Sequence, residues 1–184
     1  MHGNRLAKAG AAMLIGALAI TGCSSAAAKT TAPRSSGAGR QVRIMVYSIN
    51  SDGPNLRAVL DGAIGDYGPA VTVYPDGKVD PSHSSELELN LTRGSFRLNI
   101  AELIQRFTAA TSHEPIYPGT CSDYVSVRAP VPVVAGSGTG SYQKISGRFT
   151  LTATLNEDET PPCTGPASFL WQVITISGSG TFTP

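Results

Sequence analysis

One stretch of the sequence, residues 134–155, constrains the fold more than any other. Its second half alternates strictly, because Phe149, Leu151, Ala153 and Leu155 are apolar and the residues between them are Arg or Thr. An apolar side chain at every second position is typical of a β-strand with one face in a core and the other in water. Residues 136–140, GSGTG, precede this strand and predict a turn. The stretch therefore predicts an antiparallel β-domain.

Other segments predict the rest of a sheet. Alternation or β-branched composition indicates strands at residues 42–49, 71–74, 87–91, 96–100, 125–134 and 169–176. Residues 56–64 fit a helix or a strand, and Gly62, Gly65 and Gly68 favour an irregular or bulged strand. The loop Thr92-Arg93-Gly94 predicts a hairpin with a three-residue turn. The last strand is apolar on both faces, so we expect it either in the middle of the sheet or covered on its outer face by the helix.

The sequence predicts one helix, at residues 100–110, capped by Asn99 with Glu102 completing a capping box. Residues 156–159, NEDE, predict an acidic turn. The expected fold class is all-β, a single antiparallel β-barrel of about eight strands with one short helix. A β-sandwich is the alternative.

The first 22 residues predict a signal peptide. Arg5 and Lys8 precede an apolar run that is about a dozen residues long, too short to span a bilayer. Ile20-Thr21-Gly22-Cys23 resembles a bacterial lipobox, which implies cleavage before Cys23 and acylation of its thiol and amino group. The alternative is an ordinary signal peptide in which Cys23 is incidental.

Residues 23–40 are rich in Ser, Ala, Thr and Gly and predict a flexible tether, which leaves residues 41–184 for the β-domain. We therefore expect an exported protein, anchored to the outer face of the cell membrane by lipid on Cys23.

Charge argues against nucleic acid as a partner. Charged residues make up 15% of the chain, against about 25% in typical domains. From Cys23 onward 12 basic residues face 13 acidic ones. No basic stripe is present to neutralise phosphates.

The two remaining cysteines, Cys121 and Cys163, predict one structural disulfide in an exported domain. A redox pair is more often C-x-x-C, and a metal site needs further ligands nearby.

Few residues offer chemistry. His83 and His113 have no metal-ligand spacing and are expected in solvated loops. The GSGTG run lacks the G-K-[ST] ending of a phosphate loop, and residues 156–159 lack the spacing of a calcium loop. Asp61, Asp66 and Tyr67 are the candidates for lining a pocket. The sequence predicts no cofactor and no metal site.

A short motif, Gly138-Thr139-Gly140 followed by Tyr142, Gly147 and Leu151, resembles one in small β-barrels of the allene-oxide-cyclase and dirigent type. The resemblance covers about twenty residues. It implies a barrel whose glycines permit a tight crossing above a packed aromatic ring, and it transfers no catalytic residue. The whole layout is similar to lipoproteins of unknown function in mycobacteria and other actinobacteria.

These observations favour a non-enzymatic, lipid-anchored envelope protein that binds a small apolar ligand or a surface partner. One alternative is a cyclase- or isomerase-like enzyme in the barrel mouth, which rests on fold resemblance alone. Another is a structural surface lipoprotein without a ligand.

Overall fold

The computed structural model describes residues 40–49, 56–79, 84–112, 117, 119–161, 163 and 169–183. The chain divides into residues 1–36 and residues 37–184, and every described residue belongs to the second unit. The predicted signal peptide, Cys23, His83 and His113 lie outside the described residues.

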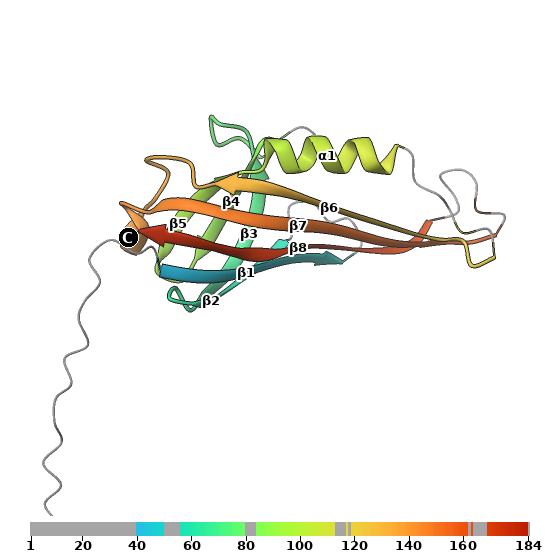
Figure 1. The fold of residues 1–184 in the computed structure, drawn as a ribbon, viewed down its shortest axis with the longest axis horizontal. Helices are drawn as coiled ribbons and strands as arrows, with labels where there is room; N and C mark the ends of the chain where they lie inside the picture. Colours follow the sequence, from blue (N-terminus) through green and yellow to red (C-terminus); the bar gives the residue numbers. More distant parts are fainter. Residues whose placement is uncertain are drawn as a thin grey trace, which may run out of the picture. The chain divides into compact units, whose positions relative to one another are not determined.

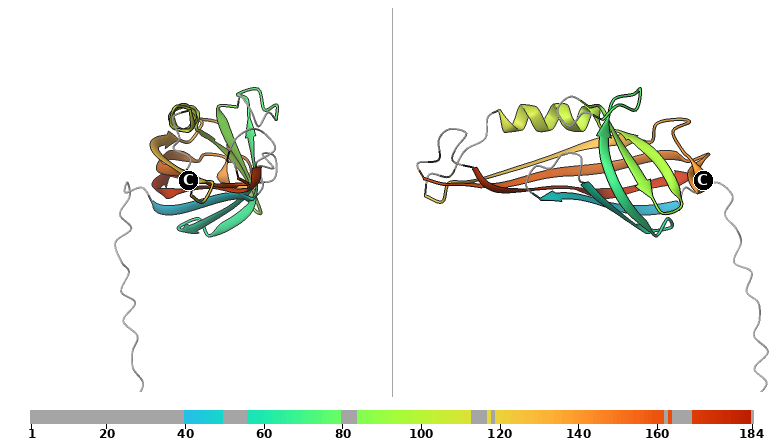
Figure 2. Two further views of the ribbon diagram at one scale, coloured as in Figure 1. Left: turned by 90° about the vertical axis from the view of Figure 1, so that its right-hand side faces the viewer. Right: turned by 180° about the vertical axis from the view of Figure 1, so that it is seen from behind.

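Eight strands form one antiparallel sheet in the order β5-β4-β3-β2-β1-β8-β7-β6 (Figure 1). The strands are β1 (Arg40–Ile49), β2 (Leu56–Gly62), β3 (Asp66–Val73), β4 (Glu86–Leu91), β5 (Gly94–Asn99), β6 (Ser122–Pro132), β7 (Ser146–Glu159) and β8 (Phe169–Thr183). The sheet curls into a half-barrel, which Figure 2 shows from the end. The predicted fold class is confirmed.

Alternation decides which side chains fill the barrel. The largest fully buried ones include Phe96, Phe149, Leu60, Leu87, Leu89, Leu98 and Leu151. All of them belong to one hydrophobic cluster. The barrel interior is therefore filled by the chain's own side chains, as is usual in barrels of this size.

The hairpin of β4 and β5 forms as expected, but its loop is one residue shorter than predicted. Leu91 pairs with Gly94, so only Thr92 and Arg93 lie between the strands.

The two edge strands of the sheet, β5 and β6, are brought together by the segment that follows β6, residues 133–141, here called the seam. Seam N–H groups donate to the β5 carbonyls of Ser95 and Arg97, each at 2.8 Å. In return the Ser95 N–H donates to Thr139 Oγ1 and the Arg97 N–H to Ser137 Oγ, both at 2.9 Å. The seam thus satisfies backbone groups that an edge strand would leave open.

Two facing glycines permit this close contact. A Cβ atom on Gly94 would lie 2.2 Å from the Thr139 carbonyl oxygen, and one on Gly140 would lie 2.5 Å from that of Arg93. Both glycines have positive φ, 139° and 55°, which side chains disfavour. The GSGTG run is therefore a turn and a seam, and it leads into a short 3₁₀ helix, η1 (Gly140–Tyr142).

The single helix, α1 (Ala101–Thr111), begins and ends one residue later than predicted. Asn99 Oδ1 accepts the first helical N–H at 3.1 Å. The expected capping box is absent, because Glu102 pairs with Arg106 at 2.6 Å instead. Arg106 also donates to the Arg128 carbonyl of β6 at 2.8 Å, which fixes the helix along that edge strand (Figure 1).

Three strands, β6, β7 and β8, continue past the rest of the sheet (Figures 1 and 2). The last residue of β1, Ile49, pairs with Val173 of β8. From that row outward, residues 122–124, 156–159 and 169–173 form a three-stranded extension, here called the arm.

The prediction of an acidic turn at residues 156–159 was wrong, because these residues are the end of β7. They pair with β8 on one side, and residues 156–158 pair with residues 122–124 of β6 on the other. Hydrogen-bond ladders on both sides stabilise extended backbone even for Asn and Asp, whose local preference is for turns.

The prediction that the last strand ends at residue 176 was also wrong, since β8 continues to Thr183. Gly180 pairs with Phe149 of β7, and a Cβ on Gly180 would lie 2.8 Å from the Phe149 ring. The glycine therefore leaves room for a large core side chain and does not end the strand. As expected, β8 is central, between β1 and β7.

Candidate functional site

The arm carries an open hollow of about 490 Å³. Three aromatic side chains line it, and they are unusually exposed: Tyr117 at 57%, Tyr124 at 53% and Trp171 at 41%. Exposed groups of large apolar side chains mark binding surfaces more often than isolated ones do. The hollow is therefore the candidate functional site.

Strand pairing brings six of the nine lining residues together in two adjacent rows. The rows are Ser122, Asp158 and Trp171, and then Tyr124, Asn156 and Val173. Residues two apart in a strand face the same side, so both rows lie on one face of the arm. That face is the outer one, because Asn156 alternates with the buried Leu155. The hollow combines aromatic faces with hydroxyl, amide and carboxylate groups.

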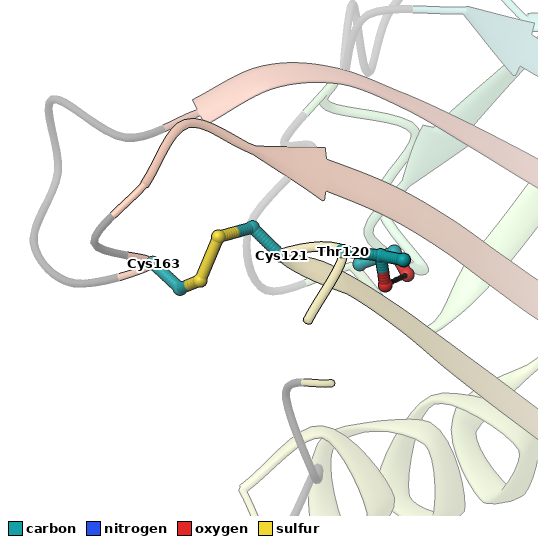
Figure 3. The surroundings of a disulfide bond; sticks show 4 residues. Thr120, Cys121 and Cys163 are labelled. Atoms are coloured by element: carbon teal, nitrogen blue, oxygen red, sulfur yellow. Dashed lines mark hydrogen bonds between the residues drawn. A yellow bond between two sulfur atoms is a disulfide. The ribbon is translucent and has the colours of Figure 1, made fainter. Parts of the chain in front are cut away.

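A disulfide between Cys121 and Cys163 fixes the outer end of the arm (Figure 3). It joins the residue before β6 to the segment after β7, with 5.1 Å between the two Cα atoms. The Glu159 N–H also donates to the Cys121 carbonyl at 2.7 Å. The pairing that the cysteine count predicted therefore holds the strands that build the hollow.

A second polar cluster surrounds Asp66, which is 4% exposed and lies inside the barrel. The hydroxyls of Tyr142 and Thr92 donate to its two carboxylate oxygens, each at 2.5 Å. Backbone N–H groups of Tyr67, Thr92 and Arg93 donate at 2.8–3.3 Å, and Arg93 Nε donates at 3.3 Å. The carboxylate is thus surrounded by donors from three parts of the chain.

Electrostatics matches this geometry. Burial alone raises the pKa of Asp66, but the hydrogen bonds from Thr92, Tyr142, Tyr67 and Arg93 outweigh it and hold the pKa well below its usual range. Burial and the hydrogen bond to Asp66 raise the pKa of Tyr142 to about 12. Asp66 is therefore ionised and Tyr142 neutral at ordinary pH. The cluster cross-links the barrel.

The structure separates the three residues that the sequence offered as pocket candidates. Asp66 points into the barrel, whereas Tyr67 is 67% exposed on the outside. Asp61 is exposed and forms an ion pair with Arg43 of β1. The three side chains do not meet in one cavity.

Sequence reasoning missed the hollow, because its residues come from separate strands and become neighbours only through the register of the sheet. One signal was available. Trp171 and Val173 share a face of β8, while the opposite face, with Ile174 and Ile176, is apolar as well. One of those two apolar faces had to meet solvent or a partner.

Three further results bear on function. Within the described ranges, no group of three or more His, Cys, Asp or Glu side chains is placed to hold a metal ion. Among the described residues, no helix is both long enough and apolar enough to cross a membrane. Comparison of the chain with protein-family models, with curated proteins and with solved structures found no match.

Proposed function

We propose that this protein is a non-enzymatic binding protein of the cell envelope, anchored by lipid on Cys23, and that the hollow of the arm is its binding site. The exposure of Tyr117, Tyr124 and Trp171 around one hollow carries the proposal. Each large aromatic side chain offers some 150–250 Å² for burial against a ligand. The barrel interior is filled by side chains, so the ligand site belongs on the surface.

The course of the chain supports an anchored binding module. Arg40, the first residue of β1, pairs with Phe182 near the end of β8. Trp171 lies 11 residues away on the same strand, which is about 36 Å at the usual rise of a strand. The tether therefore joins the domain at one end of β8, and the hollow lies near the other end of that strand. The tether itself has a typical reach of about 23 Å if it is flexible.

The placement of acid–base groups supports binding over catalysis. Asp66 is enclosed by hydrogen-bond donors, and Asp61 and Tyr67 face solvent at separate points. A general acid or base needs access to a substrate held beside it. None of these three residues has that arrangement.

The anchor is tested by metabolic labelling with an alkyne fatty acid in a bacterial host. We expect label and membrane fractionation for the natural chain, and loss of both for Cys23→Ser. Equal labelling of the two proteins would contradict the anchor.

Binding is tested through Trp171, which is the only tryptophan of the chain and so reports on the hollow by its fluorescence. The mature full-length protein in detergent is titrated with a panel of neutral saccharides, ammonium compounds and lipid vesicles. We expect at least one compound to cause a saturable change in emission. Tyr124→Ala should weaken the binding of that compound, whereas Tyr67→Ala, which changes an exposed tyrosine of β3, should leave its affinity unchanged. No saturable response across the panel would refute the hollow as the binding site.

A further inference from the structure

The arm carries an excess of negative charge. Four carboxylates, those of Asp123, Glu157, Asp158 and Glu159, lie in it or at its edge. Asp123 stands directly opposite Glu157 in the pairing of β6 with β7. Among the residues described, none of the four forms an ion pair.

The next basic residue along β6 is Arg128, five positions beyond Asp123, which corresponds to about 17 Å. At that separation a surface charge in physiological salt is largely screened. The chain's own basic groups on this strand therefore leave the charge of the arm uncompensated.

Two of these carboxylates also have an oxygen atom without a hydrogen-bond partner among the described residues. Asp123 Oδ1 and Glu159 Oε2 are buried oxygen atoms without a partner in the described part of the chain. Burial raises the pKa of Asp123, and Glu159 and Asp158 raise it further by repulsion. Burial and the charges of Asp123 and Glu159 raise the pKa of Glu157 in the same way. Asp123 and Glu157 are thus each in a negative field that a cation would relieve.

The hollow places this field beside aromatic rings. Asp158 stands in the same cross-strand row as Trp171 and lines the hollow with it. Asp123 and Glu157 line the hollow as well, although their positions in the strands alternate with that of Asp158. A cation in the hollow would therefore lie beside three carboxylates, those of Asp123, Glu157 and Asp158.

We propose that the hollow binds an organic ammonium group, with the faces of Trp171, Tyr124 and Tyr117 around it and Asp158 balancing its charge. Aromatic faces attract ammonium groups through their quadrupole, and quaternary ammonium groups are bound by such sets of rings. The volume of about 490 Å³ also leaves room for the rest of a small ligand. This inference rests on the proposed binding function and names the ligand class.

The test compares two molecules of equal shape. The mature full-length protein is titrated with choline and with its neutral isostere 3,3-dimethylbutan-1-ol, and Trp171 emission is recorded. We expect saturable binding of choline, at least tenfold tighter than that of the alcohol, and weaker at high salt. Nα-acetyl-lysinamide, titrated in parallel, distinguishes a primary ammonium source, such as a lysine side chain, from a quaternary one.

A matched pair of variants isolates the charge. Asp158→Asn is expected to weaken choline binding about tenfold and leave alcohol binding unchanged. Asp76→Asn, which makes the same change at an exposed turn outside the arm, is expected to alter neither affinity. Far-UV circular dichroism establishes that both variants are folded.

Equal affinity for choline and the alcohol, or no effect of Asp158→Asn, would overturn the ammonium inference. Saturable binding of a neutral saccharide alone would overturn it too, but would leave the proposed binding function intact. Failure of every compound to change Trp171 emission would overturn both.

Discussion

Replacing Tyr142 by Phe removes one hydroxyl from the inside of the barrel and leaves the ring in place. The ring packs edge-on against Phe96, with 5.3 Å between ring centroids. The hydroxyl donates to Asp66 Oδ2 at 2.5 Å. Phe preserves the first contact and deletes the second, so Tyr142→Phe isolates one hydrogen bond, which joins η1 to β3.

The expected loss in the free energy of unfolding depends on the hydrogen-bond donors that Asp66 keeps in Tyr142→Phe. A hydrogen bond to a charged group contributes about 1.5–3 kcal/mol to stability. The Asp66 carboxylate keeps the donors of Thr92, Tyr67 and Arg93, so it is not left without partners. We therefore expect a loss near the lower end, about 1.5–2 kcal/mol. Asp66→Asn should cost more, about 3 kcal/mol, because its amide N–H₂ would face groups that are themselves donors.

The pH dependence of stability has a definite sign. The pKa of Asp66 is lower in the folded chain than its ordinary value of 3.8, so the stabilisation is present above about pH 4 and is lost as the pH falls. The pKa of Tyr142 is raised from 10.0 to about 12, so its contribution is complete below pH 10 and is lost between pH 10 and 12. The natural protein should lose stability in both ranges. Tyr142→Phe should lack the loss between pH 10 and 12.

Urea unfolding, followed by circular dichroism, measures these effects. At a typical slope for a domain of this size, the expected loss at pH 7 moves the midpoint by about 1 M. Tyr47→Phe, which removes the hydroxyl of an exposed tyrosine on β1, is the matched control and should leave the midpoint unchanged. The cluster would be refuted as a cross-link if Tyr142→Phe lowered the free energy of unfolding by less than about 0.5 kcal/mol. It would also be refuted if the natural protein and Tyr142→Phe lost the same stability between pH 10 and 12.

Two further predictions concern the seam and the arm. Gly140→Ala should lower the free energy of unfolding by about 3 kcal/mol, because it combines a positive φ with a Cβ 2.5 Å from the Arg93 carbonyl oxygen. Gly119→Ala, with nothing within 4 Å of its Cβ, should change it by less than about 0.5 kcal/mol, and equal urea midpoints for the two variants would contradict the seam. Replacing both Cys121 and Cys163 by Ser should cost about 4 kcal/mol, because the bridge closes a loop with a sequence separation of 42 residues. An unchanged thermal midpoint for the double variant would contradict a structural role of the disulfide.

Local patterns in the sequence predicted the strands and their buried faces. Phe149 and Leu151 are buried, as alternation required, because a strand's period of two follows from backbone geometry alone. The loop bounds were less accurate, since sheet pairing on both sides extends residues 156–159 against their turn preference.

The two polar features could not be predicted from local pattern. Tyr142 and Asp66 are 76 residues apart and meet only because the seam returns across β5. Tyr124 and Trp171 come together only through the pairing of β6 and β8 with β7. Both features depend on the register of the whole sheet, which no single segment specifies.

The same register explains why the barrel and the arm can be perturbed separately. The row of Val127, Ala153 and Ile176 belongs to the core cluster or packs against it, and the arm begins beyond that row. The arm is held instead by its own hydrogen-bond ladders and by the disulfide. Outward-facing changes such as Tyr124→Ala and Asp158→Asn remove no core contact, so they should alter global stability by less than about 0.5 kcal/mol. Loss of binding in a variant of normal stability would then report on the hollow itself, whereas loss of the disulfide should weaken binding while the barrel remains folded.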